Sequence, residues 1–313
     1  MILGTRKHYK PIHYGWAYNL FEKHEKMHWL PTEVPMADDI RDYNTRLTNG
    51  EKNLLIQILR FFTQGDLEVQ NNYNTQLIHN FQLPEITMML SSFASRENIH
   101  VWAYSHLNDT LGLPENEYSK FLEYEEMRKK IDKMHYYSTG ASVSDMALAL
   151  NLAVFGGFIE GVSLFGSFAV LLNFSRRGLM KGVGQIVAWS AEDESIHSLG
   201  VSTLFKTLVQ ESNINLEVLA DRVYTACIDI VNAEKEFLKL CFADGDVVGL
   251  KLEDTCKYIE YLADMRLRGL GYEPLFKVSE NPLPYMDTML SAKEHTNFFE
   301  NRATEYAKGA INW

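Results

Sequence analysis

The chain has 313 residues, of which 46% are hydrophobic and 23% charged, a balance typical of a globular protein with a sizeable core. Its formal net charge of -11 would repel phosphate backbones, so we expect no nucleic-acid partner. The three cysteines form neither a CxxC pair nor a disulfide framework, and the N-terminus lacks the apolar stretch of a signal peptide. We therefore expect reduced thiols and a cytoplasmic protein.

Helical periodicities follow one another along the chain. Thr48 or Asn49 is a candidate cap for a first long helix, and Pro84 a candidate start for the next. The predicted helices cover residues 51–81, 85–112, 115–137, 146–174, 178–209, 216–242 and 250–270. No segment alternates with the period of a strand, so strands are minor at most. The sequence predicts an all-α, elongated helical bundle forming a single domain over residues 1–313.

The apolar segment Met146–Phe174 is long enough to cross a membrane. It carries Asn151 and Glu160 near its middle, and no second apolar segment accompanies it. An unpaired carboxylate at the centre of a bilayer is costly, whereas a helix that is apolar all round suits the middle of a large soluble bundle. We therefore expect a core helix and no membrane partner.

Two Glu-x-x-His motifs, Glu97–His100 and Glu194–His197, lie within long helices whose other faces are apolar. Residues three apart share a helical face, so each motif can direct a carboxylate and an imidazole to one point. A third match, Glu25–His28, lies in a short polar stretch and is interpreted as chance. Two further helices each place one acid, Asp66 or Glu160, in an apolar stretch, where a buried carboxylate needs a partner.

These acids and histidines form a set of four carboxylates and two imidazoles spread over four helices. Ferritin-like di-iron and di-manganese proteins have this arrangement, with Glu as the single acid. Oxygen and imidazole ligands without thiolate suit iron or manganese. The alternative is that the acids belong to buried ion pairs and the histidines are ordinary core residues. We predict a di-metal site made by Asp66, Glu97, His100, Glu160, Glu194 and His197.

Over nearly its whole length the chain resembles the small, radical-generating subunit of class I ribonucleotide reductase. The resemblance rests on the ordered ligand set and on Tyr104 and Trp29. Asp66 as the first ligand is typical of that family, as are the stretches HWLPTEVPM and FFENRATEY. It implies a ferritin-like fold, two iron or two manganese ions (or one of each), and an oxygen-derived bridging ligand.

Three further residues take roles in this comparison. Tyr104 lies four residues after His100, shares its helical face, and by resemblance is the radical site. Asp193 points away from its neighbour Glu194 and is a candidate acceptor for the ring nitrogen of His100 that binds no metal. By resemblance it also links His100 to Trp29 in a path for electron and proton transfer. From its sequence context alone, Trp29 is a packing anchor.

The chain departs from the family pattern in two places. Glu192 stands where many members carry Arg, which leaves the charge balance beside Asp193 open. The family also ends in a flexible tail that docks on the large subunit and contains a relay tyrosine. This chain stops at Trp313, soon after Tyr306, so we expect the tail to be short or missing.

The resemblance implies the function of a ribonucleoside-diphosphate reductase small subunit, an oxidoreductase that supplies deoxyribonucleotides for DNA replication. Metals and oxygen would oxidise Tyr104 to a radical, and the oxidising equivalent would pass to a separate large catalytic subunit. A homodimer is expected, together with a flavodoxin-like activator if the metal is manganese.

Two other functions fit parts of the pattern. A di-metal hydroxylase or ligand-binding oxidase would keep the metal ligands and would need a cavity for an apolar substrate, but neither Trp29 nor Asp193. A ferritin-like metal store or a helical scaffold would need neither Tyr104 nor Asp193.

Overall fold

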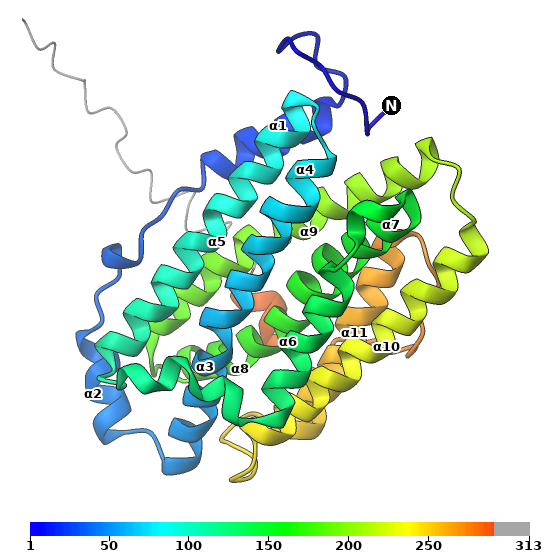
Figure 1. Ribbon diagram of the computed structural model, residues 1–313. Coiled ribbons are helices and arrows are strands. Elements are labelled where there is room, and N and C mark those ends of the chain that lie inside the picture. Colours follow the sequence, from blue (N-terminus) through cyan, green and yellow to red (C-terminus); the bar gives the residue numbers. More distant parts are fainter. Residues whose placement is uncertain (291–313) are drawn as a thin grey trace, which may run out of the picture.

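Four long helical stretches run side by side through the computed structural model, which describes residues 1–290 (Figure 1). They are α3 (Asn49–Asn72), α5 (Pro84–Thr110), a continuous stretch over residues 145–176, and α9 (Lys181–Glu211). The continuous stretch consists of α7 (Asp145–Leu152), the π-helical segment η6 (Ala153–Ser163) and α8 (Leu164–Arg176). Helix α3 packs on α5, and α9 packs on η6 and α8. We call these four stretches the core bundle.

The remaining long helices cover the core bundle. Helix α1 (Gly15–Glu25) lies along α5 and α9, and α2 (Ala37–Thr45) contacts α9. On the other side, α10 (Leu216–Cys241) and α11 (Leu252–Leu270) pack on η6, and α6 (Glu125–Ser138) packs on α10. Shorter helical segments are η1 (Pro31–Glu33), η2 (Tyr73–Leu77), α4 (Ile78–Asn80), η3 (Glu115–Tyr118), η4 (Lys120–Glu123) and η5 (Ala141–Val143). Residues 1–290 contain no strand beyond an isolated bridge, so the predicted all-α class is confirmed.

Local sequence signals explain where the core helices begin and end. Thr48 caps α3: its side chain accepts from the backbone of Glu51, whose carboxylate accepts from the backbone of Thr48 in return. Pro84 starts α5, where its fixed φ suits a first helical turn. Gly112 follows α5 with φ +71°, the left-handed conformation that ends a helix and that glycine adopts without strain.

Residues 115–137 depart from the predicted single helix, because two short 3-10 segments precede α6. The Glu117 carboxylate accepts a bond of 2.5 Å from Arg60 of α3 and pairs with Lys120. The Tyr118 hydroxyl meets Ser105 of α5 at 2.9 Å. These bonds to two core helices compete with a regular helix, which starts only at Glu125.

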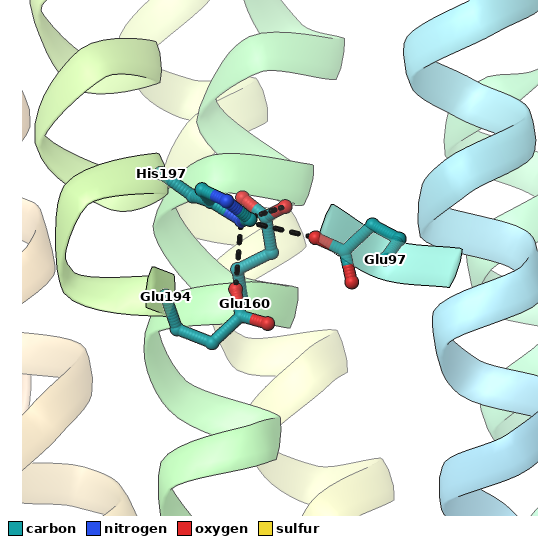
Figure 2. Close-up of side chains that lie close together, drawn as sticks. All are labelled: Glu97, Glu160, Glu194 and His197. Carbon is teal, nitrogen blue, oxygen red and sulfur yellow. Dashed lines mark ion pairs between the residues drawn. The ribbon is translucent and has the colours of Figure 1, made fainter. Parts of the chain in front are cut away.

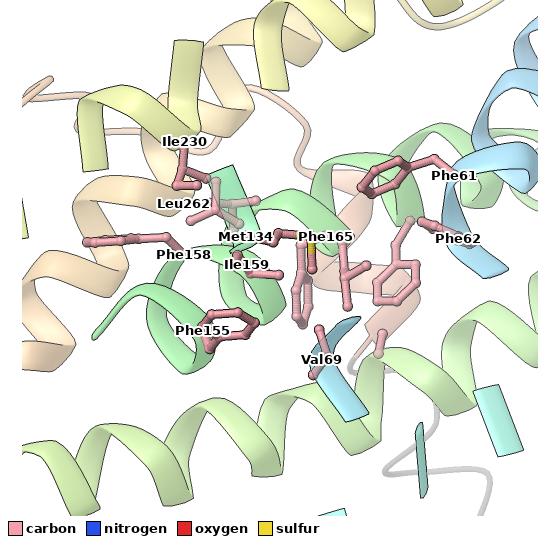
Figure 3. Close-up of a cluster of buried hydrophobic side chains, with 14 of the residues drawn as sticks. Phe61, Phe62, Val69, Met134, Phe155, Phe158, Ile159, Phe165, Ile230 and Leu262 are labelled. Atoms are coloured by element: carbon pink, nitrogen blue, oxygen red, sulfur yellow. The ribbon is translucent and has the colours of Figure 1, made fainter. Parts of the chain in front are cut away.

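The apolar stretch over residues 145–176 is a core helix. It is long and apolar enough to cross a membrane, but 94% of its most apolar window is buried inside the structure. Figure 3 shows its side chains meeting those of α3, α10 and α11. The drawn cluster includes Phe61, Phe62, Val69, Met134, Phe155, Phe158, Ile159, Phe165, Ile230 and Leu262.

The middle of this stretch is π-helical, which the sequence did not predict. Ser198 of α9 donates a 2.6 Å bond to the carbonyl oxygen of Gly156. A Cβ on Gly156 would lie 2.4 Å from Val201, and one on Gly161 would lie 2.4 Å from Arg266. Glycine at these positions therefore lets η6 approach α9 and α11 closely, and π-helical turns of this kind are frequent at functional sites.

Several predictions concern residues 291–313, which lie outside the described part. They include the FFENRATEY stretch, Tyr306 and the docking tail. The single-domain assignment over residues 1–313 likewise stays a prediction.

Candidate metal centre

The six predicted ligands come from all four stretches of the core bundle and are completely buried. They meet in two groups whose ligand atoms lie within 4.8 Å of one another. One group contains Asp66, Glu97 and His100, and the other contains Glu97, Glu160, Glu194 and His197. Figure 2 shows the second group, with three carboxylates directed at the imidazole.

Two carboxylates lie between the histidines. Glu97 places Oε2 3.2 Å from Nδ1 of His100 and Oε1 3.0 Å from Nδ1 of His197. Glu194 does the same, with Oε1 3.2 Å from Nδ1 of His100 and Oε2 3.3 Å from Nδ1 of His197. Each carboxylate therefore presents one oxygen to each half of the site, as a bridge between two metal ions requires.

Asp66 and Glu160 occupy opposite halves of the site. Asp66 belongs to the group around His100, and Glu160 places Oε1 3.7 Å from Nδ1 of His197. Each half thus has one histidine and one carboxylate of its own, besides the two that it shares. This donor set fits a pair of iron or manganese ions.

The hydrogen bonding of the six ligand side chains tests independently whether they suit a pair of metal ions. Within the described residues, both carboxylate oxygens of Asp66, Glu160 and Glu194 lack a hydrogen-bond donor, as does Oε1 of Glu97. Nδ1 of His197 also makes no hydrogen bond, although Oε1 of Glu97 lies only 3.0 Å away. Buried carboxylates in this state are costly, and two cations would satisfy them.

The electrostatics of Asp66 and Glu160, the two acids that are not shared, lead to the same conclusion. Burial, reinforced by Glu97 and Glu194, raises the pKa of Asp66 well above its ordinary value. Burial likewise raises the pKa of Glu160 to about 7, although His197 opposes the shift. Bound cations would reverse these shifts, because they stabilise the ionised carboxylates.

Asp193 lies immediately outside the site and joins several groups through one oxygen. Its Oδ2 lies 3.2 Å from Nε2 of His100 and accepts a 2.8 Å bond from Nε1 of Trp29. The Trp29 ring also stacks on the His100 ring, with centroids 5.9 Å apart. The hydrogen bonds expected from the sequence are therefore present, and they form an unbroken connection from His100 to Trp29.

Tyr104 lies beside the Asp66 half of the site and is 1% exposed. Its ring centroid is 6.5 Å from that of His100 and 4.6 Å from that of Phe62. Phe168 packs on Phe62 at 5.6 Å. Burial raises the pKa of Tyr104 well above its ordinary value, and Asp66 adds to the effect. The tyrosine is thus enclosed in an apolar wall that keeps out water.

Comparison with known proteins decides the family. Residues 6–282 match the family described as "Ribonucleotide reductase, small chain". The chain belongs to this family. It is 42% identical to the "Probable ribonucleoside-diphosphate reductase small subunit 376L" of Invertebrate iridescent virus 6, covering 98% of this chain and 95% of the relative. It is 28% identical to the "Ribonucleoside-diphosphate reductase subunit beta" of Chlamydia pneumoniae, covering 97% and 91%.

Solved structures support the fold of this small subunit. The ribonucleotide reductase R2 subunit from Clostridium botulinum superposes with a TM-score of 0.82 at 22% identity, over 91% of each chain. Dimanganese(II)-NrdF from Streptococcus sanguinis gives a TM-score of 0.81 at 18% identity, covering 92% of this chain and 99% of that one. The predicted ferritin-like fold and the oxidoreductase family are therefore confirmed, and a class I small subunit works with a large subunit.

Three residues around the small subunit's site were not predicted from the sequence. Arg96 contacts Asp193, with Nη1 3.3 Å from Oδ2. Tyr73 is buried with its ring 6.1 Å from His197, and its position seven residues after Asp66 was an available signal. His24 of α1 meets His197, and burial, helped by His197 itself, lowers the pKa of His24 to about 2. No sequence pattern on α1 indicated His24.

Proposed function

We propose that this small subunit holds two iron or two manganese ions, or one of each, between the six predicted ligands. The observation that carries this proposal is the convergence of buried carboxylate oxygens without hydrogen-bond donors. Glu97 and Glu194 would bridge the two ions, while Asp66 with His100 and Glu160 with His197 would complete the two coordination spheres. When bound, such ions enable molecular oxygen or a reduced oxygen species to oxidise a nearby group.

Tyr104 is the group in this chain that would store the oxidising equivalent. Its hydroxyl proton must leave when the ring is oxidised, and Asp66 is an acid whose charge acts on that hydroxyl. The rings of Phe62 and Phe168 keep water and reductants away. Enclosure of this kind lengthens the lifetime of a neutral tyrosyl radical.

Trp29, Asp193 and His100 would connect this store to the partner. The Trp29 indole donates to Asp193, and the same oxygen faces His100, so a proton can shift within the trio as an electron passes along it. The route would continue to the large catalytic subunit, where ribonucleotides are reduced. Burial of all three groups preserves their geometry between turnovers.

Family membership supports a proposal for the assembly and its surroundings. We propose a homodimer in the cytoplasm that docks on the large subunit. If manganese is the working metal, a flavodoxin-like activator would supply the reduced oxygen species. One structural neighbour, the NrdF protein from Streptococcus sanguinis, is described as a dimanganese(II) protein.

The decisive experiment is electron paramagnetic resonance (EPR) of protein loaded separately with iron(II) and manganese(II) without oxygen, then exposed to oxygen. The manganese sample is also exposed to superoxide. An organic-radical signal is expected, and it should vanish in Tyr104→Phe. Tyr73→Phe is the matched control, because Tyr73 is an equally buried tyrosine on the His197 side, and it should keep the signal. A metal-centred signal that both variants retain would contradict the role of Tyr104.

A further inference from the structure

A chain of hydrogen bonds leads from His197 out to the protein surface. Nε2 of His197 lies 3.2 Å from Nε2 of His24. Nδ1 of His24 lies 2.7 Å from Oγ of Ser92, which donates a 2.6 Å bond to the Glu25 carboxylate. His197, His24 and Ser92 are buried, whereas Glu25 is exposed and lines a surface groove of about 630 Å³.

Counting donors and acceptors gives the chain one direction. The Glu25 carboxylate can only accept, so the single hydroxyl proton of Ser92 must point to it. Ser92 then has no proton left for His24, and Nδ1 of His24 must carry the proton of their bond. A neutral His24 with a proton on Nδ1 has a bare Nε2, which accepts from Nε2 of His197.

The chain therefore determines which nitrogen of His197 is available to a metal. With its proton on Nε2, His197 presents an unprotonated Nδ1 to Glu97, Glu160 and Glu194. The opposite direction would have Nε2 of His24 donate to a bare Nε2 of His197 and would leave the His197 proton on Nδ1, where it would block a metal. Asp193 Oδ1, 3.5 Å from His24, makes no hydrogen bond, as expected if Nε2 of His24 carries no proton.

The two halves of the site are thus supported differently. His100 is bound directly to the buried carboxylate of Asp193, whereas His197 is held through two neutral groups by an acid at the surface. A hydrogen bond to the outer nitrogen of a metal-binding imidazole fixes its tautomer and strengthens it as a ligand. Loss of such a partner typically weakens metal binding by about 10- to 100-fold.

We propose that His24 and Ser92 are positioning residues that select the metal-binding nitrogen of His197 and set metal affinity in that half of the site. This inference rests on the proposed metal centre. It assigns a role to helix α1, which supplies no ligand, and to the groove beside it. Ser92→Ala should weaken only the Glu160–His197 half.

The test is an oxygen-free titration with manganese(II), in which EPR follows the free ion. Ser92→Ala should bind one of its two ions about 10-fold more weakly than the wild type. Ser91→Ala is the matched control, because Ser91 is exposed, lines the same groove and lies one residue from the chain. Ser92→Thr keeps the hydroxyl and should restore binding. Far-ultraviolet circular dichroism checks that each variant is folded.

A second readout does not depend on affinity. In zinc(II)-loaded protein with nitrogen-15-labelled histidine, His197 should show a proton on Nε2 that exchanges slowly with solvent. His24→Leu removes the acceptor, so this proton should exchange faster. Equal manganese affinities for Ser92→Ala and Ser91→Ala, with two ions still bound, would overturn the positioning role and leave the metal centre intact. Failure of the wild type to bind manganese would overturn both.

Discussion

Arg96 of α5 and Asp193 of α9 form a buried ion pair, with Nη1 of Arg96 3.3 Å from Oδ2 of Asp193. Arg96 also donates a 2.9 Å bond to the carbonyl oxygen of Met27, two residues before Trp29. Burial acts to raise the pKa of Asp193, but His100 and Arg96 outweigh it and lower that pKa. Arg96 of a neighbouring helix therefore supplies the positive charge beside Asp193 that the sequence left open at Glu192.

Arg96→Gln should therefore destabilise the protein and loosen the segment that carries Trp29. Removing one partner of a buried ion pair leaves the other charge uncompensated and costs about 3 kcal/mol or more. Urea unfolding would measure this loss. Arg96→Lys keeps the charge but loses the forked geometry, so it should recover only part of the stability. An Arg96→Gln protein as stable as the wild type would show that the pair does not hold this region together.

Trp29→Phe should separate radical storage from radical transfer. Phenylalanine keeps an aromatic ring against His100 but removes the N–H that bonds Asp193. We expect the Tyr104 radical to form in normal yield, while nucleotide reduction in the presence of the large subunit falls to background. EPR and a reduction assay on the same sample measure both quantities. Normal reduction by the variant would remove Trp29 from the path.

Much of the site was predictable because its information is local in sequence. The three-residue spacing of Glu97 and His100 fixes their common face once the segment is helical. Glu160 was recognisable as a carboxylate in an apolar run with no basic residue nearby. Long-range contacts carry no such signal: His24 meets His197 across 173 residues, and α1 shows no pattern that indicates it.

The details of the helices were less predictable than their existence. Residues 153–163 are apolar and glycine-rich, which suits an α-helix and a π-helix alike, and the close approach of Gly156 to Val201 is a tertiary contact that no local pattern shows. The late start of α6 depends on the bond between Glu117 and Arg60, which are 57 residues apart. In both cases tertiary contacts override local propensity.

Gly156→Ala should displace η6 and with it the Glu160 ligand. The added methyl would lie 2.4 Å from Val201, and a packed core resists such an insertion at a cost of about 1–3 kcal/mol. Gly269→Ala is the matched control, because Gly269 is exposed in α11 with no atom within 4 Å of the new methyl. That variant should gain up to about 1 kcal/mol through helix propensity. Thermal unfolding would measure the stability of both variants, and manganese stoichiometry would show whether the Glu160 ligand is displaced. Wild-type stability and stoichiometry in Gly156→Ala would argue against close packing of η6.

Glu85 anchors the N-terminal segment to α5 and should make its attachment depend on pH. The buried carboxylate accepts a 2.5 Å bond from Arg6 and backbone bonds from His13, at 2.9 Å, and Tyr14, at 3.3 Å. Burial acts to raise the pKa of Glu85, but these backbone N–H groups and Arg6 outweigh it, so the pKa is lowered.

A carboxyl group whose pKa is lower in the folded state stabilises the protein above its unfolded pKa, about 4.3 for Glu. This contribution is lost as the pH falls through the folded value. Glu85→Gln removes the titration, so the wild type should be more stable than this variant by about 1–3 kcal/mol at pH 7. Urea unfolding between pH 7 and pH 3.5 should show the difference shrinking below about pH 4.3. A difference in stability that stays constant over this range would mean that the shape of the Glu85 side chain, and not its charge, holds the N-terminal segment.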